Sequence, residues 1–199
     1  MRTVLVDYGV GNMFSMYNAL LRSGFEVSVA KNPSEIRLAN TLILPGVGNF
    51  EVASRNLERF RWTLSKRVED GAYILGSCLG MQLLFNQSEE GSGEGLAYIK
   101  GVVKQFEGSL KIPHMGWNTI TISKQSELLD GVDGEYFYFV HSYYPEPVDP
   151  NVILATTCYG VEFASVVGKG NVFGCQFHPE KSGKAGAKLL GNFRALLRK

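Results

Sequence analysis

Residues 72–82 read AYILGSCLGMQ, and this stretch decides the fold. The apolar run AYIL is typical of a buried strand, and LGMQLLFNQ (79–87) predicts a helix directly after it. Cys78 lies at the junction, between Gly76 and Gly80. A nucleophile between two such glycines is typical of a sharp strand-to-helix turn, which lifts the side chain above the carboxyl edge of a sheet.

The segments around this turn repeat the alternation of strand and helix. In the first half, strand patterns and helix patterns alternate at 3–7, 11–24, 26–30, 41–45 and 51–70. The second half is richer in strand patterns, at 119–123, 135–140, 152–159 and a hairpin over 165–177, before a final helix. We therefore expect an α/β fold with an open, mostly parallel central sheet flanked by helices. The antiparallel strands of the second half are expected to join the same sheet, within one domain over residues 1–199.

Composition excludes several classes of protein. The chain has 199 residues, 45% of them hydrophobic, with 20 basic and 19 acidic side chains, so neither nucleic acid nor a membrane surface is an expected partner. No apolar run is long enough to cross a bilayer, and the first residues lack a signal-peptide pattern. The three cysteines show no CxxC spacing, which argues against disulfides and a zinc site. A cytoplasmic location is the expected default, because free thiols persist in reducing compartments.

Cys78 has two possible roles. A single cysteine is more often a small buried hydrophobe than a nucleophile, but its place between a strand and a helix favours the nucleophile. A helix N-terminus stabilises a thiolate, and the backbone N–H of Leu79 would face a developing oxyanion. Cys158 and Cys175 lie within strand patterns, and we expect both in the core.

A thiol nucleophile needs a base, and the base needs a group that orients it. His178 and Glu180 lie in QFHPEKS (176–182), where an extended backbone would direct both to one side. His-x-Glu alone is a weak signal, but beside the turn at Cys78 it predicts a Cys-His-Glu set. His114 and His141 are expected to be structural.

Two glycine-containing loops follow strands near the start of the chain. PGVGNF (45–50) contains Gly46 and Gly48, which let a loop present backbone N–H groups, so a second oxyanion donor is predicted there. DYGVGN (7–12) is not a dinucleotide fingerprint, because Phe14 stands where the third glycine would be.

GSCLGMQLLF, PGVGNF and FHPEKS together resemble the class I, triad-type glutamine amidotransferases. More narrowly, DYGVGN, HMGWN (114–118), YFVHSYY (138–144) and FHPEKSG (177–183) are similar to the branch of that family that provides the glutaminase subunits of imidazole glycerol phosphate synthases. The similarity extends from Asp7 to the final helix. One departure is Ser77, where the family more often has an aliphatic residue.

The resemblance implies roles for particular residues. Cys78 would be the nucleophile, His178 the acid and base, and Glu180 its orienting partner. The remaining implied residues are an oxyanion loop and donor (Gly46, Val47, Gly48, Leu79), a glutamine pocket (Gln82, Glu90, Ser142, Tyr143) and a partner interface (Asn12, Trp117, Lys181).

The resemblance also implies a reaction and a partner. Glutamine would be hydrolysed to glutamate and ammonia through a cysteine thioester, with no cofactor and no metal. The ammonia would pass to a cyclase subunit with a (β/α)8-barrel fold, in a heterodimer, which converts the ribotide PRFAR to imidazole glycerol phosphate and AICAR.

Three alternatives remain open at this point. The first is a class I amidotransferase subunit of another biosynthetic pathway, against which HMGWN and DYGVGN argue. The second is a stand-alone thiol hydrolase such as a peptidase. The third is a binding module without activity, which would be expected to lack a member of the Cys-His-Glu set.

Overall fold

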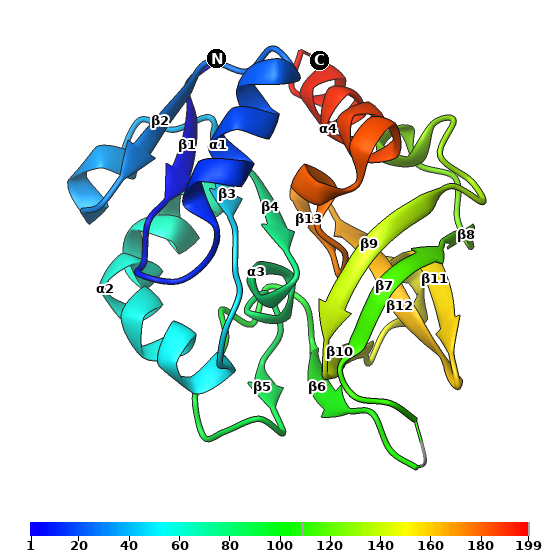
Figure 1. Ribbon diagram of the computed structural model, residues 1–199. Helices are drawn as coiled ribbons and strands as arrows, with labels where there is room; N and C mark the ends of the chain where they lie inside the picture. The colour runs from blue at the N-terminus through cyan, green and yellow to red at the C-terminus, as the bar shows by residue number, and fades with distance from the viewer. Residues whose placement is uncertain (109, 199) are drawn as a thin grey trace.

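The computed structural model describes residues 1–108 and 110–198, and a central sheet of eight strands crosses it (Figure 1). The strand order is β2-β1-β3-β4-β13-β12-β11-β8. The bounds are β1 Thr3–Val6, β2 Val27–Ala30, β3 Thr41–Leu44, β4 Tyr73–Ser77, β8 Thr121–Ile122, β11 Ile153–Tyr159, β12 Val161–Lys169 and β13 Val172–Cys175. The pairings from β2 to β13 are parallel, and those from β13 to β8 are antiparallel. The predicted α/β class with a mostly parallel sheet is confirmed.

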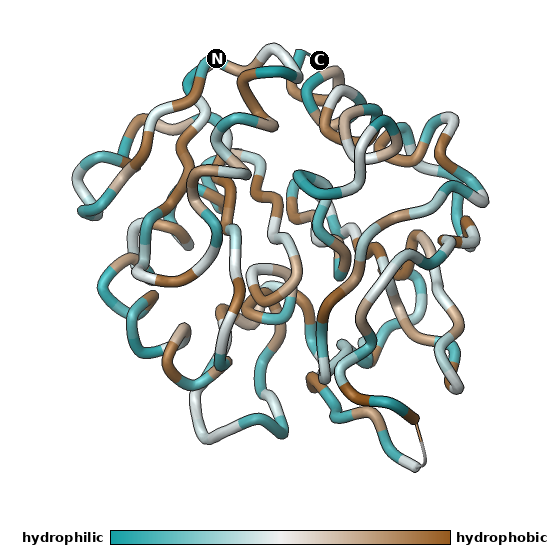
Figure 2. The backbone as a smooth tube through the Cα atoms, in the orientation of Figure 1, coloured by the Kyte–Doolittle hydropathy of each residue, from teal (hydrophilic) through white to brown (hydrophobic). Residues whose placement is uncertain are grey.

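Helices cover both faces of this sheet. They are α1 (Met13–Arg22), α2 (Phe50–Glu69), α3 (Leu79–Gln82) and α4 (Gly183–Leu196), with short 3₁₀ turns η1 (Pro33–Ile36), η2 (Glu127–Leu129), η3 (Pro150–Val152) and η4 (Pro179–Lys181). Side chains alternate between the faces of a strand. Val4 and Val6 of β1 therefore pack in one core cluster with α2, while Leu5 packs in the other with α1 and α4. Figure 2 shows the hydrophobic colour concentrated on the central strands.

The ends of the first two helices follow from local sequence. The side chain of Asn12 accepts a hydrogen bond from the Ser15 N–H at the start of α1, and Asn49 caps α2 in the same way. Gly24, just past α1, has φ +81°, which glycine adopts at little cost. The helices predicted over 11–24 and 51–70 are confirmed to within two residues.

The helix predicted over 79–87 is wrong beyond Gln82, where α3 ends. Leu83, Leu84 and Phe85 are buried, but their carbonyl groups accept hydrogen bonds from the backbone of residues 96–99. A continued helix would have used some of these carbonyls internally. The apolar run therefore turns into the core and pairs with a later loop.

The strands of the second half do not all join the central sheet. The expectation holds for β8, β11, β12 and β13, but five others form two smaller sheets. One contains β5 (Gln87–Ser88), β6 (Gly101–Gln105) and β10 (Tyr143–Pro147), and the other is a ribbon of β7 (His114–Thr119) and β9 (Tyr136–His141). The ribbon packs on the central core through its phenylalanines, with the rings of Phe137 and Phe177 stacked at 4.0 Å between centroids.

We expect the ribbon to depend on its inward face. Phe137 is fully buried, whereas its neighbour Tyr136 is 60% exposed. Phe137→Ala should lower the free energy of unfolding by about 3–5 kcal/mol, because it removes a buried ring and leaves a cavity. Tyr136→Ala, the matched control, should cost no more than about 1 kcal/mol. Urea unfolding of both variants measures this, and equal losses would contradict the packing described.

Candidate active site

The chain bends sharply between β4 and α3, at Cys78. This residue has φ 51° and ψ −111°, a conformation that is strained for any residue with a side chain and typical of functional sites. A Cβ atom on Gly80 would collide with the carbonyl oxygen of Leu44, and one on Gly76 with the backbone of Gly80. Both glycines are therefore needed for α3 to begin this close to β3.

The Cys78 sulfur is only 5% exposed and makes two polar contacts. It donates to the Val140 carbonyl at 3.7 Å, and it accepts from Gln176 Nε2 at 3.7 Å. Because α3 has only four residues, its dipole supports a thiolate less than the predicted longer helix would. Direct hydrogen bonds and nearby charges therefore matter more at this sulfur.

His178 and Glu180 form a buried pair. Their Nδ1 and Oε1 atoms are 2.8 Å apart, and the two side chains are 2% and 4% exposed. His178 Nε2 and Glu180 Oε2 have no hydrogen-bond partner among the described residues. One ring nitrogen of His178 is thus held by the carboxylate while the other is free to exchange a proton.

The backbone reaches this geometry by a turn, and the expected extended segment is wrong. His178 is extended, but Pro179–Lys181 form the 3₁₀ turn η4. The His178 N–H donates to the Tyr138 carbonyl, and the Ser182 hydroxyl donates to the His178 carbonyl at 2.6 Å. The turn brings the carboxylate of Glu180 back to the imidazole.

Opposing effects act on the pKa of His178. Burial lowers it, but interactions with the Cys78 sulfur and the Glu180 carboxylate outweigh burial and raise the pKa to about 10. The imidazole is therefore protonated at neutral pH while the sulfur is charged. The pair resembles a thiolate–imidazolium couple.

A cavity of about 310 Å³ opens beside the sulfur. It is lined by Val47, Gly48, Cys78, Leu79, Gln82, Glu90, Pro113, Val140, His141, Ser142 and Tyr143. This set includes all four residues predicted for a glutamine pocket and three of the four predicted for oxyanion stabilisation. Gly46, the fourth, packs against the start of α3, where a Cβ would lie 2.7 Å from the Gly80 nitrogen. His178 and Glu180 do not line the cavity.

Glu90 brings a carboxylate to the cavity wall. Its Oε2 accepts from the Phe50 N–H at 2.6 Å, at the start of α2. Burial raises the pKa of Glu90, and hydrogen bonds from Phe50 and Asn49 oppose this rise. The site can therefore hold a cationic group beside the carboxylate.

The 45–50 loop is anchored at its two ends. The Tyr8 hydroxyl donates to the Pro45 carbonyl at 2.5 Å, and Asn49 caps α2. Between these anchors Gly48 has φ +120°, with open space where a Cβ would be. Val47 and Gly48 can therefore present backbone groups to the cavity.

The unusual Ser77 and the other two cysteines have separate outcomes. Ser77 is buried, and its hydroxyl donates to the Phe177 carbonyl at 3.3 Å, which ties β4 to the segment before His178. Cys175 is buried as expected, and burial raises its pKa well above the ordinary value. The expectation for Cys158 is wrong: it is exposed, because side chains alternate along β11 and its neighbour Thr157 takes the inward position.

The other two histidines form a buried pair, as the structural expectation requires. His114 Nδ1 and His141 Nε2 are 3.0 Å apart, and His141 Nδ1 donates to the Tyr143 carbonyl at 2.8 Å. Burial lowers their pKa values to about 4 and about 3, so both are neutral at pH 7. Sequence reasoning missed Gln176, although it lies two residues before His178 in QFHPEKS.

The three residues predicted at a partner interface are exposed. Trp117 packs edge-on against Tyr138 at 5.9 Å between ring centroids, and Lys181 Nζ lies 5.7 Å from the same ring. Asn12 caps α1, which packs against η4. Trp117 and Lys181 therefore share one surface feature, and Asn12 lies on an adjoining element.

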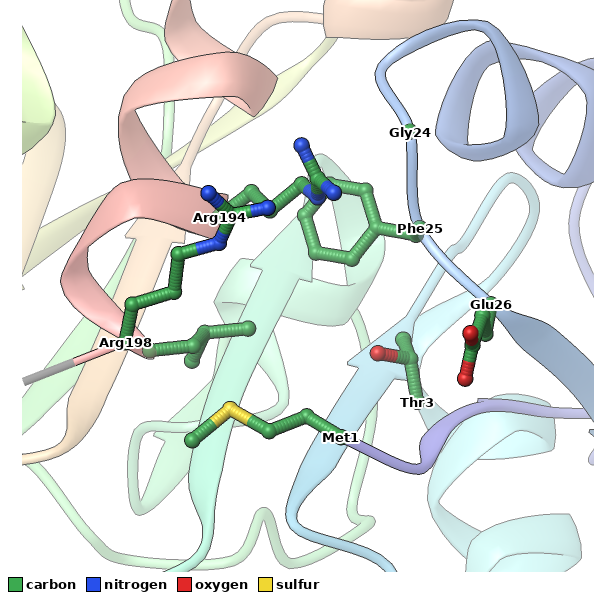
Figure 3. A pocket seen from close by; sticks show the side chains of 8 residues that line it. Met1, Thr3, Gly24, Phe25, Glu26, Arg194 and Arg198 are labelled. Atoms are coloured by element: carbon green, nitrogen blue, oxygen red, sulfur yellow. The ribbon is translucent and has the colours of Figure 1, made fainter.

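A second cavity, of about 240 Å³, lies at the other end of the strands (Figure 3). Its lining includes Met1 and Thr3, at the start of β1, together with Arg194 and Arg198. Figure 3 shows the guanidinium group of Arg194 beside Phe25. Because this lining holds no nucleophile or histidine, the reaction site is assigned to the cavity at Cys78.

Two further searches of the described residues returned nothing. In residues 1–108 and 110–198, no three His, Cys, Asp or Glu side chains lie close enough together to hold a metal ion. No helix within the same ranges has the length and apolar character needed to cross a membrane.

Comparison with known proteins defines the class of protein. The model of the family "Glutamine amidotransferase class-I" matches residues 4–196, and the chain belongs to this family. The fold agrees: a glutamine amidotransferase crystal structure (20% identical, covering 99% of this chain and 100% of that chain) superposes with a TM-score of 0.79. PurLQS from Thermotoga maritima (22% identical, 98% of both chains) superposes with 0.80.

Closer relatives carry a single name, "Imidazole glycerol phosphate synthase subunit HisH". The protein of that name from Methanocaldococcus jannaschii is 47% identical over 195 residues, which cover 97% of this chain and 98% of the relative. That from Sulfolobus acidocaldarius is 43% identical over the full length of both chains.

The three cysteines should react differently with iodoacetamide. At pH 6.5 Cys78 should be alkylated faster than Cys158, because the imidazolium of His178 favours its thiolate, and Cys175 should not react. Peptide mapping by mass spectrometry gives the rate at each position, and labelling in urea is the control in which all three react. Labelling of Cys175 at a rate similar to that of Cys78 would contradict the assignment.

Proposed function

We propose that this chain is the glutaminase subunit of an imidazole glycerol phosphate synthase. It hydrolyses glutamine through a cysteine thioester and passes ammonia to a cyclase subunit. The observation that carries the proposal is the buried His178–Glu180 pair beside the strained Cys78, at a cavity of about 310 Å³. Relatives that are 42–47% identical over nearly the whole chain carry that subunit's name.

The first step releases ammonia. The Cys78 thiolate attacks the carboxamide carbon of glutamine, and backbone N–H groups of Leu79 and the Val47–Gly48 segment stabilise the oxyanion. His178 is protonated at neutral pH, so it can donate its proton to the departing nitrogen. Collapse of the intermediate leaves a thioester on Cys78 and ammonia in the cavity.

The second step uses the same imidazole as a base. Once the sulfur is part of a thioester it carries no charge, so one cause of the raised pKa of His178 disappears. The imidazole can then accept a proton from water as it attacks the thioester. Glu180 holds the ring and stabilises its cation in both steps.

The cavity walls suit the amino-acid end of glutamine. The carboxylate of Glu90 would pair with the α-ammonium group, and Gln82 and the backbone of Ser142 and Tyr143 would bind the α-carboxylate. The Glu90 carboxylate is about half buried, so a cation next to it lowers the cost of keeping it ionised.

The partner would be a (β/α)8-barrel cyclase, in a heterodimer located in the cytoplasm. Ammonia released into water would be protonated and lose its nucleophilicity, so the cyclase must receive it directly. Asn12, Trp117 and Lys181 would contact the cyclase, and the exposure of Trp117, at 56%, is consistent with a covered role in the complex. The subunit of another pathway has less support, because amidotransferase structures that serve other pathways are at most 22% identical.

Cys78→Ala should separate two activities. In the complex it should abolish glutamine-dependent synthesis but leave synthesis from free ammonium unchanged, because the thiol serves only ammonia release. Product formation with glutamine or with ammonium measures this, and Cys158→Ser is the control, since that thiol lies outside the site. Equal loss of both activities, with assembly intact, would contradict the proposed division of labour.

The pH dependence should reflect the raised pKa of His178. Since this pKa is raised from 6.5 to about 10, the acid form persists through neutral pH, and kcat/KM for glutamine should fall on the alkaline side near pH 10. Glu180→Gln removes one cause of the rise and should move this fall to lower pH. Kinetics between pH 6 and 10.5 test this, with circular dichroism to check folding. A fall centred near pH 6.5 in the unmodified enzyme would contradict the interpretation.

A further inference from the structure

Gln176 lies directly after β13 and is fully buried, with 0% exposure. Its Nε2 donates to the Cys78 sulfur at 3.7 Å, and its Oε1 accepts from Gln82 Nε2 at 3.2 Å. No role in the reaction has been assigned to it above. A buried amide has no water to satisfy it, so both of its contacts affect the groups that it touches.

The orientation of this amide follows from its neighbours. The Tyr143 carbonyl can only accept hydrogen bonds, so Gln82 must present its N–H to it, at 2.9 Å. The second N–H of Gln82 then faces Gln176, whose oxygen must be the acceptor. The nitrogen of Gln176 is consequently the end that faces the sulfur.

His141 strengthens this orientation. Its Nδ1 also donates to the Tyr143 carbonyl, at 2.8 Å, and its pKa of about 3 keeps the ring neutral. The carbonyl therefore accepts two hydrogen bonds, which accounts for both of its lone pairs. Gln82 and Gln176 cannot both flip without setting an amide oxygen against this carbonyl.

The two contacts of the sulfur favour opposite states of Cys78. The Val140 carbonyl accepts a hydrogen bond from the thiol and can offer nothing to a thiolate. The amide N–H of Gln176 donates, and a donated hydrogen bond is stronger when the acceptor is charged. Among the described residues, Gln176 is the hydrogen-bond donor found at this sulfur besides the interaction with His178.

We infer that Gln176 is a further residue of the active site, which stabilises the Cys78 thiolate through its amide N–H. Its carbonyl end is held by Gln82, a residue of the proposed glutamine pocket, so pocket and nucleophile share one hydrogen-bond network. The inference rests on the proposed function only in taking Cys78 as the reacting thiol.

The test measures the alkylation rate of Cys78 against pH in the full-length chain, in a Cys158→Ser background. Gln176→Met removes the donor at similar volume and should raise the apparent pKa of the thiol by about one unit, which lowers the rate at pH 7 about tenfold. Gln176→Glu keeps an acceptor for Gln82 but sets an oxygen beside the sulfur, so it should also slow the reaction at pH 7 and above. Both contacts at the sulfur depend on Gln176, whereas packing alone would not shift this profile.

Ser165→Ala is the matched control. Ser165 is buried on the neighbouring strand, its hydroxyl has no partner, and its backbone carbonyl accepts from the Gln176 N–H. Its loss should leave the profile unchanged. Folded Gln176 variants with the unmodified profile would overturn the inference, and so would failure of both variants to fold, which would make Gln176 a structural residue. Because alkylation needs no glutamine, failure of the proposed function would appear separately, as unchanged glutaminase activity in Cys78→Ala.

Discussion

The structure depends on the close approach of α3 to the end of β3, which is possible only because Gly80 has no side chain. The Leu44 carbonyl occupies the space that a Cβ would need. This approach forces the sharp turn at Cys78 and its positive φ. Backbone strain of this kind costs about 1–3 kcal/mol and persists only where the surroundings hold it. Here the parallel pairing of β4 with β3 and β13 provides that support.

The pairing of β4 with β13 brings the chemistry together. Cys175 lies opposite Ser77, so two segments about one hundred residues apart in the chain end at the same edge of the sheet. The nucleophile follows one strand and the histidine follows the other. The turn η4 then adds the carboxylate of Glu180. Three side chains from two segments thus depend on one strand register, and a shift of one residue would turn them to the opposite face.

Charge in this buried site is balanced by neighbours instead of water. The pKa of His178 rises and those of His114 and His141 fall, although all three rings are largely buried. The difference lies in their partners: His178 faces a sulfur and a carboxylate, whereas the other two face each other and a carbonyl group. Burial alone disfavours the charged ring, and only an adjacent negative charge reverses this.

The sequence by itself determined the α/β class, the glycines at the turn, the nucleophile candidate and its His-x-Glu partner. These features are local, since strand and helix periodicity and glycine spacing are readable within a few residues. Only the tertiary structure decided where α3 ends, that β7 and β9 leave the central sheet, that Cys158 faces outward and that Gln176 reaches the sulfur. Each of these depends on contacts between segments distant in the chain. Such contacts decide which carbonyl, face or donor is left available, and no local pattern records them.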